Sequence, residues 1–320
     1  MQYYASMQEL IGHTPLVALT HLGFPAGVRV FAKLELWNPA GSAKDRVGRA
    51  MLDAAEASGR LRPGGTVVEG TAGNTGLGIA FAALNRGYRV IFVVPEKFSS
   101  EKQTLMRALG AEIVHTPRVG GMQAAAARAR EIAAGIPGAI TLEQFRNPAN
   151  PGAHYRTTGP EIYQALDGRV DYLVSGAGSG GTFTGILRYL KEQDPVVRGV
   201  LADPYGSIIG GGEHGAYEIE GIGNDFIAET MDMGLVDAVY KIHDEEAFAA
   251  VRTLARKEGI LAGSSSGAAL AAAQKLAADG ARGNIVVPII DRAERYFSKH
   301  LLEESAGEPI AAAQEDAAAG

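Results

Sequence analysis

The chain contains no cysteine among its 320 residues. Disulfide bonds, thiolate metal ligands and a cysteine nucleophile are therefore excluded as features of this sequence. Histidine is also scarce, with seven residues in the chain. They are scattered without the spacing of metal ligands, so we expect no metal site. We interpret the histidines as structural or surface residues, with a reservation for His154.

Long apolar runs and a strong excess of one charge are absent as well. No stretch of about 18 apolar residues is present, and the N-terminus lacks the pattern of a signal peptide, so we expect a cytoplasmic protein. The formal net charge is −6, from 30 basic and 36 acidic residues, which gives no electrostatic reason to expect a nucleic acid or a membrane as partner. With 46% hydrophobic residues, the chain is long enough for about two globular domains.

Short apolar segments alternate with segments of helical periodicity. The expected strands cover residues 66–68, 89–95, 113–115, 172–175, 197–202 and 284–290. This alternation predicts an α/β fold of mainly parallel sheets with helices on both faces. Two such series, at about 41–146 and 155–303, are separated by a turn-rich segment at 147–151. The Ala-rich and acidic tail at 304–320 is expected to be disordered.

Lys44 is the most informative single residue. It lies in the segment Asn38–Arg46 (NPAGSAKDR), where a glycine-containing turn leads into a helix with Ser42 and Asp45 spaced as a capping box. A cation at a helix N-terminus is disfavoured, so we expect a lowered pKa for Lys44, as a lysine that forms a Schiff base requires. A solvated lysine is the commoner outcome for such a pattern, so the other motifs decide between the two.

Two glycine-rich loops join an expected strand or loop to a helix. Gly70–Gly76 (GTAGNTG) offers backbone amides that suit a carboxylate or phosphate, although a plain tight turn is an equal alternative. Gly263–Gly267 (GSSSG) precedes an Ala-rich helix. Its serines are explained either by helix capping or by a hydroxyl that meets a ring nitrogen.

A third loop, Gly176–Thr182 (GAGSGGT), satisfies the GxGxxG pattern of dinucleotide-binding proteins, and Asp203 ends the next strand. The same loop suits a single phosphate monoester, because the hydroxyls of Ser179 and Thr182 add donors to the backbone amides. The pattern alone does not choose between a dinucleotide and one phosphate.

Together these motifs resemble the cysteine synthase and cystathionine β-synthase family of pyridoxal-phosphate enzymes, from about Leu10 to Leu302, and most closely its bacterial O-acetylserine-dependent members. Further segments that carry the resemblance are Ile11–Leu16 (IGHTPL), Gln144–Phe145, Asn147–Pro151, Glu220–Gly223 and Glu294–Tyr296. The family implies a tryptophan synthase β-like fold (fold type II) with two doubly wound sheet domains. Residues 1–40 plus 147–303 would form the larger cofactor-binding domain, and residues 41–146 a smaller mobile domain that closes over the substrate.

The resemblance also implies a role for each matching residue. Lys44 would bind pyridoxal 5′-phosphate covalently and later take the Cα proton of the substrate, Asn74 would hydrogen-bond the ring hydroxyl, and Ser265 would face the pyridine nitrogen. The phosphate would be held by Gly178, Ser179, Gly180, Gly181 and Thr182. The amino-acid substrate would be bound by Thr71, Ala72, Gly73, Asn74, Thr75, Gln144 and Gly221.

The activity implied is β-replacement on O-acetylserine, or serine, with sulfide to give L-cysteine. The alternatives are cystathionine β-synthase activity with homocysteine, a non-enzymatic role as a partner of the serine acetyltransferase C-terminal tail, and a dehydrogenase that uses Asp203. A homodimer is implied by the resemblance alone. The sequence departs from the family at Ala72, where serine is usual, at Asn224 and at 289–293, so the resemblance leaves the substrate specificity open.

Overall fold

The computed structural model describes residues 3–71, 73–96, 100–117 and 119–303. The expectations for Ala72 and for a disordered tail at 304–320 therefore lie outside the described residues. Within the described part of the chain, no helix combines the length and the apolar character needed to span a bilayer.

Strands and helices alternate along the chain as the periodicity predicts. The strands are β1 (Leu16–Ala18), β2 (Val28–Lys33), β3 (Thr66–Gly70), β4 (Arg89–Pro95), β5 (Glu112–Thr116), β6 (Tyr172–Gly176), β7 (Arg198–Pro204), β8 (Ala238–Ile242) and β9 (Gly283–Pro288). The α-helices are α1 (Lys44–Ala57), α2 (Asn74–Ala83), α3 (Ser100–Ala108), α4 (Gly121–Ala134), α5 (Ala149–Arg156), α6 (Thr158–Ala165), α7 (Gly181–Gln193), α8 (Asp244–Glu258) and α9 (Ser264–Ala278). Short 3-10 helices are η1 (Met7–Leu10), η2 (Glu35–Trp37), η3 (Met233–Leu235) and η4 (Ala293–Lys299).

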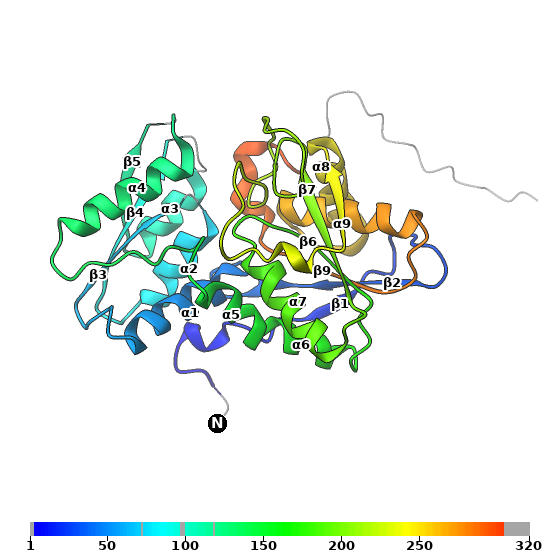
Figure 1. The fold of residues 1–320 in the computed structure, drawn as a ribbon, viewed down its shortest axis with the longest axis horizontal. Coiled ribbons are helices and arrows are strands. Elements are labelled where there is room, and N and C mark those ends of the chain that lie inside the picture. Colours follow the sequence, from blue (N-terminus) through cyan, green and yellow to red (C-terminus); the bar gives the residue numbers. More distant parts are fainter. Residues whose placement is uncertain (1–2, 72, 97–99, 118, 304–320) are drawn as a thin grey trace, which may run out of the picture.

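The smaller sheet has the strand order β3-β4-β5, and its strands are parallel. Its side chains alternate between two helical layers. Val67 and Phe92 pack toward α1 and α2, whereas Val68 and Val93 pack against α4. Both faces are covered, which explains why β4 is apolar at consecutive positions. Figure 1 shows this unit as a separate lobe of the molecule.

The larger sheet has the strand order β1-β2-β9-β6-β7-β8 and is parallel except for the edge pair β1 and β2. Val174 and Val287 belong to the core beneath α8 and α9, and Leu173 and Val286 belong to the core on the side of α6 and α7. The prediction of an α/β fold with two mainly parallel sheets is confirmed (Figure 1).

Helices α1 and α2 pack against each other through glycines. A Cβ atom at Gly48 would overlap the backbone of Gly78, and one at Gly78 would overlap the carbonyl of Lys44. The absence of side chains at these two positions therefore lets α2 lie directly against the first turn of α1. As a result, the start of α2 and Lys44 lie close to each other.

Six strands are predicted to within a few residues, and β1, β2 and β8 are missed. Strand β1 has three residues at a sheet edge. In β2 and β8 the residues Arg29, Lys33 and Lys241 interrupt the apolar pattern. These strands are stabilised by pairing with neighbours, for example β2 with β9, that are distant in sequence. The proposed domain boundaries at 40/41 and 146/147 stay predictions.

Candidate active site

Lys44 is the first residue of α1, as the sequence predicts. The capping differs from the predicted box, because Ala43 takes the N-cap position and its side chain makes no cap bond. The hydroxyl of Ser42 accepts the Lys44 backbone N–H at 3.2 Å, and the Asp45 carboxylate accepts the N–H of Ala40 at 2.6 Å. Ala40, in the turn before the helix, thus supplies the backbone donor for the Asp45 carboxylate in place of the N-cap residue.

The Lys44 amine is partly buried and lines a small cavity. Burial lowers the pKa of Lys44 because it removes the ammonium from water, while the charges of Asp291 and Glu35 oppose the shift. Desolvation is thus the main cause, whereas the sequence had suggested the helix N-terminus. A lowered pKa increases the population of the neutral, nucleophilic amine.

The wall opposite Lys44 is built from glycines at the junction of β6 and α7. The residues that line the cavity are Lys44, Gly176, Ala177, Gly178, Gly180, Thr182, Gly221, Ile222 and Ile290. A Cβ atom at Gly178 would lie 2.6 Å from the carbonyl oxygen of Gly221, and one at Gly181 would overlap Asn150 Oδ1. Only glycine fits at these positions, and the first amides of α7 have no partner within the helix, which suits an anion such as phosphate.

Two hydroxyls of this loop are held by buried side chains. Asn150 Nδ2 donates to Ser179 Oγ at 3.0 Å, and His154 Nε2 lies 3.0 Å from Thr182 Oγ1. The other ring nitrogen of His154, Nδ1, lies 2.8 Å from Thr158 Oγ1. Burial lowers the pKa of His154 to about 3, so the imidazole is neutral. The contacts of His154 are those of a structural residue that orients a hydroxyl of the predicted phosphate loop.

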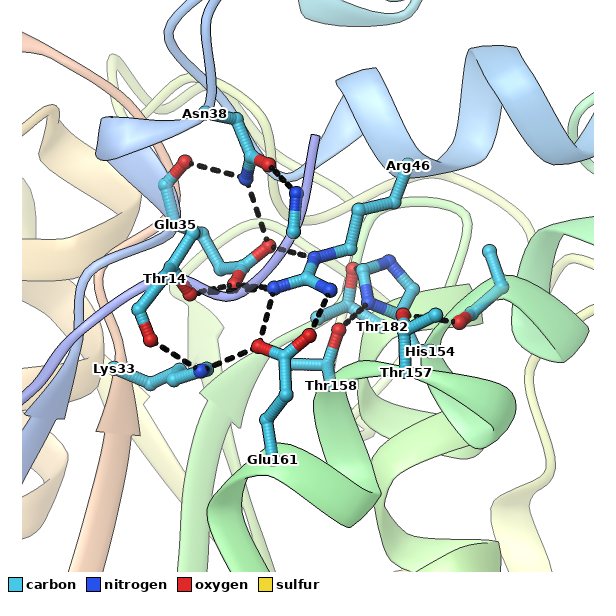
Figure 2. Close-up of polar contacts among 12 residues, drawn as sticks. Thr14, Lys33, Glu35, Asn38, Arg46, His154, Thr157, Thr158, Glu161 and Thr182 are labelled. Carbon is cyan, nitrogen blue, oxygen red and sulfur yellow. Dashed lines mark hydrogen bonds and ion pairs between the residues drawn. The ribbon is translucent and has the colours of Figure 1, made fainter. Parts of the chain in front are cut away.

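Next to His154 lies a buried network of two cations, Arg46 and Lys33, and two carboxylates, Glu35 and Glu161 (Figure 2). Arg46 contacts Glu35 through Nε and Nη2, each at 2.8 Å, and Glu161 through Nη1 and Nη2 at 2.6 and 2.8 Å. Lys33 Nζ donates to Glu161 Oε2 at 2.6 Å. Burial alone would raise the pKa of Glu35, but the charge and hydrogen bonds of Arg46, together with smaller contributions that include the Thr14 hydrogen bond, lower that pKa to about 2. The network ties α1 to β2 and α6 and so sets the position of Lys44. Sequence reasoning missed it, because its members are far apart in the chain.

The predicted substrate loop starts α2. Thr75 Oγ1 donates to Gln144 Oε1 at 2.6 Å, and Thr71 Oγ1 accepts the N–H of Gly76 at 3.2 Å. Gly73 is the N-cap of α2. The structure therefore brings Gln144 to the loop at 71–76, as expected, while Ala72 is outside the described residues.

Glu69, which the sequence did not indicate, anchors the segment that carries Gln144. Its carboxylate accepts the backbone N–H groups of Leu142, Glu143 and Gln144 at 2.9 to 3.1 Å. The carboxylate is buried, and burial raises its pKa although these three donors oppose the shift. A single carboxylate at the end of β3 thus positions the segment that faces the substrate loop.

The serines of the third loop have different partners. Ser264 Oγ accepts the N–H of Glu220 at 3.0 Å, and Ser266 Oγ accepts the N–H of Ile290 at 2.9 Å. Within the described residues, the hydroxyl of the buried Ser265 has no hydrogen-bond partner, and it lies 3.8 Å from where a Cβ of Gly221 would stand. Ser265 is therefore the serine that remains available to a ligand, and it lies beside Gly221.

Asn74 has a partner at both ends of its amide. Nδ2 donates to Asp291 Oδ2 at 2.5 Å, and Oδ1 accepts from Arg295 Nη1. Neither partner was assigned a role from the sequence, although Asp291 falls in the departing segment 289–293 and Arg295 in the segment Glu294–Tyr296 that carries the resemblance. Asp291 forms an isolated β-bridge with Ser42, two residues before Lys44. Asn74 and Lys44 are thus connected through the segment after β9.

A second cavity, of about 500 Å³, lies on the other side of the Gln144 segment. Helix α4, residues 141–146 and Phe226 surround it, and Phe145 and Phe226 meet edge to face at 5.3 Å. Arg130 and Arg146 also line this cavity. Both guanidinium groups have carboxylate partners, Glu143 for Arg130 at 3.6 Å and Glu229 for Arg146 at 2.9 Å.

The dinucleotide alternative depended on Asp203. Its carboxylate Oδ2 accepts from Lys241 Nζ at 2.7 Å and from the Gly210 N–H at 2.9 Å, and the residue is fully buried. Asp203 therefore serves a structural ion pair and is not presented to a ribose. Among the described residues there is also no group of three or more His, Asp or Glu side chains that suits a metal ion.

Comparisons with known proteins agree with this geometry. Residues 7–291 match the family model described as "Pyridoxal-phosphate dependent enzyme". The chain is 48% identical to an O-acetylserine dependent cystathionine β-synthase of Bacillus subtilis (strain 168), covering 95% of this chain and 99% of the relative. It is 45% identical to a cysteine synthase of Helicobacter pylori (strain ATCC 700392 / 26695), covering 94% and 99%.

Solved structures show the same likeness. The crystal structure of an O-acetylserine dependent cystathionine β-synthase from Helicobacter pylori superposes with a TM-score of 0.90 at 44% identity, covering 93% of this chain and 98% of the other. A cysteine synthase from Entamoeba histolytica gives a TM-score of 0.90 at 35% identity, covering 96% and 93%.

Proposed function

The chain belongs to the family of pyridoxal-phosphate dependent enzymes, and we propose that it catalyses β-replacement on O-acetylserine with sulfide, releasing acetate and forming L-cysteine. The observation that carries this proposal is the position of the Lys44 amine, which has a lowered pKa and faces a glycine cradle at the start of α7. A reactive amine opposite a phosphate site is the arrangement that pyridoxal phosphate requires.

The residues of the cavity fit the cofactor. Its phosphate would meet the amides of the loop at 178–182 and the hydroxyls of Ser179 and Thr182, where a side chain at Gly178 or Gly181 would clash. Ser265 would offer its hydroxyl to the ring nitrogen, and Asn74 would hydrogen-bond the ring hydroxyl. A serine at the ring nitrogen does not favour ring protonation, which supports elimination at Cβ over transamination.

The chemistry at the substrate is divided between the cofactor and the chain. Pyridoxal phosphate, when bound, supplies the aldehyde that joins the substrate amine and the ring that accepts electrons from Cα. Lys44 Nζ would hold the cofactor and, once free, would take the Cα proton as a general base. The leaving acetate would carry the bonding electrons away from Cβ, the sulfur nucleophile would bond there in its place, and Lys44 would return the proton to Cα.

The α-carboxylate of the substrate is assigned to the loop at 71–75, including Ala72, together with Gln144 and the neighbouring Gly221. Thr75 already binds Gln144 Oε1, which leaves the amide N–H groups of Gln144 for a carboxylate. The amides at the start of α2 add donors of the same kind. This division places the carboxylate on the smaller lobe and the cofactor phosphate on the larger one, so the lobe at 41–146 would close as the substrate binds.

Homocysteine is the second candidate for the nucleophile, and cystathionine would then be the product. Two relatives named O-acetylserine dependent cystathionine β-synthase, at 48% and 44% identity, favour it. The cavity of about 500 Å³ does not decide between the two nucleophiles, because it shares no lining residue with the Lys44 cavity. Its two guanidinium groups, of Arg130 and Arg146, are already paired with Glu143 and Glu229.

The test uses the cofactor-loaded protein with O-acetylserine or serine as donor and sulfide or homocysteine as nucleophile. Mass spectrometry identifies the product, and acetate release is followed separately. Formation of cysteine from O-acetylserine and sulfide supports the proposal. Faster formation of cystathionine would identify homocysteine, rather than sulfide, as the nucleophile. Absence of any product with either donor, while the Lys44→Ala variant behaves identically, would refute the function.

We also propose that the enzyme is a homodimer. Several large apolar side chains are exposed within residues 3–40, and such surface suits contact with a second copy of the chain. They are Tyr3 (77% exposed), Tyr4 (65%), Trp37 (62%) and Met7 (54%). Sedimentation velocity tests the mass directly, and a Trp37→Glu variant should shift it toward the monomer.

Binding of a serine acetyltransferase C-terminal tail remains an alternative role, but a nucleophilic Lys44 supports an enzyme rather than a binding protein alone.

A further inference from the structure

The amide of Asn74 lies between two charged groups of opposite sign. Asp291 follows β9, and Arg295 lies in η4, whereas Asn74 starts α2 in the smaller lobe. The Nδ2 atom of Asn74 donates to Asp291 Oδ2 at 2.5 Å, and its Oδ1 atom accepts from Arg295 Nη1. Two residues of the C-terminal segment therefore hold one residue of the substrate loop.

The chemistry of these partners determines which end of the amide is nitrogen. A guanidinium group has only donors, so the carbonyl oxygen of Asn74 must face Arg295. A carboxylate has only acceptors, so the NH₂ group must face Asp291. An Asn side chain with neutral partners can turn over easily. A flipped Asn74 would instead place its oxygen against the Asp291 carboxylate and its NH₂ group against the Arg295 guanidinium.

Both partners are themselves held in place. The Tyr296 hydroxyl also donates to Asp291 Oδ2, and Arg295 Nη2 donates to the carbonyl of Ala40 in the turn before Lys44. Asp291 is fully buried, and its Oδ1 atom has no hydrogen-bond partner in the described part of the chain. The clamp is thus built on the turn that carries Lys44, at the wall of the cofactor cavity next to Ile290.

Asn74 keeps one N–H group for another acceptor. Asp291 takes one of its two N–H groups, and the described residues provide no acceptor for the second. We propose that Asp291 and Arg295 are positioning residues, which orient the Asn74 carboxamide so that it meets the ring oxygen of the cofactor with an N–H group and never with its carbonyl oxygen. This inference rests on the proposed function, because it concerns the same cofactor.

The consequence is a preference for the deprotonated ring oxygen. An N–H group stabilises an oxyanion, whereas an amide carbonyl would accept a hydrogen bond from the neutral hydroxyl and so stabilise the protonated form. Loss of either clamp residue should therefore weaken cofactor binding and shift the pH titration of the visible absorption band of the loaded protein. Loss of one hydrogen bond to a charged group should increase the cofactor dissociation constant roughly tenfold to a hundredfold.

The experiment is a double-mutant cycle between Asp291→Asn and Asn74→Ala, read out by cofactor dissociation constant and by the band's pH titration. In the wild-type background, Asp291→Asn should weaken binding and shift the titration. In the Asn74→Ala background, its effect on both should be clearly smaller, because only the charge that Asp291 exerts on Lys44 is then lost. An equal effect in both backgrounds, or no effect in the wild type, would overturn the proposal, since Asp291 would then act directly on Lys44 or not at all.

Two controls complete the design. Glu220→Gln removes the 2.8 Å ion pair between Lys102 and Glu220, another link between the same parts of the chain, without touching Asn74; the band should keep its titration. Arg295→Gln provides a second route if Asp291→Asn does not fold, and it should reproduce the shift. A wild-type protein that forms no visible band with pyridoxal phosphate would refute the proposed function, whereas a normal band that none of these variants alters refutes only the clamp.

Discussion

The imidazole Nε2 of His154 lies 3.0 Å from the hydroxyl oxygen of Thr182, at the start of α7, and both side chains are buried. A neutral imidazole has one donor and one acceptor nitrogen. If Nε2 carries the hydrogen, Thr182 accepts from His154 and keeps its own hydroxyl hydrogen for a phosphate oxygen. Thr158 then donates to Nδ1, which lies 2.8 Å away.

We therefore predict that His154 is the Nε2–H tautomer and that His154→Leu weakens cofactor binding about threefold to tenfold, the value of one neutral hydrogen bond. Ring-nitrogen NMR shifts identify the tautomer, and equilibrium dialysis gives the dissociation constant. His115→Leu, an exposed position on β5, is the matched control. A hydrogen on Nδ1 would contradict this assignment.

Asp45 provides a pH prediction. Burial raises the pKa of Asp45 from 3.8 to about 7, although the Ala40 N–H and Arg295 oppose the shift. The folded protein therefore retains a proton that the unfolded chain loses above pH 3.8. This group's contribution to stability is present below that value and is lost as the pH rises toward about 7.

An Asp45→Asn variant stays neutral over this range. Its free energy of unfolding relative to wild type should rise between pH 4 and pH 7. The ratio of the two unfolding equilibrium constants should change by up to about tenfold per pH unit. Urea titrations at several pH values measure the difference. Asp53→Asn, at a half-exposed position of the same helix, should run parallel to wild type, and parallel curves for Asp45→Asn would show that its carboxyl is ionised.

The glycine cradle leads to a third prediction. A Cβ atom at Gly181 would overlap Asn150 Oδ1, so Gly181→Ala should displace either Asn150 or the first turn of α7. We expect a loss of about 1–3 kcal/mol in stability, as for an overpacked site, and weaker cofactor binding. Gly135→Ala is the control, because its nearest neighbour would be 3.5 Å away. Asn150→Ala should relieve part of the Gly181→Ala defect, and strict additivity of the two changes would exclude the clash.

Local motifs explain how much of the site was predictable from the sequence. The start of α1 at Lys44, the loop before α7 and the serines before α9 depend on neighbouring residues, so short patterns reveal them. Their chemical roles came from a resemblance that spans nearly the whole folded chain. The six recovered strands are apolar enough to be recognised without their partners.

The missing parts depend on contacts between distant residues. Asn74 is 217 residues from Asp291 and 221 from Arg295 in sequence, and Arg46 is 115 from Glu161. A charged residue that will be buried in such a network has the same local pattern as a solvated one. Only the assembled sheets reveal that these charges meet, which is why Glu69, Arg46 and Asp291 were not predicted.

The link between Thr75 and Gln144 predicts a specific kinetic effect. The Thr75 hydroxyl donates to Gln144 Oε1 at 2.6 Å, which turns the amide nitrogen toward the site proposed for the substrate carboxylate. Thr75→Val keeps the shape and removes this bond, so KM for O-acetylserine should rise about tenfold while kcat changes little. Thr104→Val is the control, because the Thr104 hydroxyl donates to the Ser100 carbonyl at an exposed position of α3. A fall in kcat with unchanged KM would place Thr75 in the chemical step instead.

The buried ion network should be sensitive to the loss of Arg46 in a pH-dependent way. Arg46→Met leaves Glu35, which is fully buried, with Thr14 and Asn38 as its only side-chain donors among the described residues. Removal of one partner of a buried pair costs about 3–5 kcal/mol, so the urea midpoint should fall strongly at pH 7. Arg89→Met breaks an exposed pair with Glu112 and should leave the urea midpoint almost unchanged, because water screens this pair.

The sign of the pH dependence separates charge from packing in this variant. Arg46 holds the pKa of Glu35 at about 2 in the wild type; without that cation, burial raises the pKa and Glu35 takes up a proton in the acid range. The defect of Arg46→Met should therefore shrink as the pH falls from 7 toward 4, and Glu35→Leu combined with Arg46→Met should recover part of the loss. A defect that is equal at both pH values would mean that Arg46 contributes through the packing of its side chain and not through its charge.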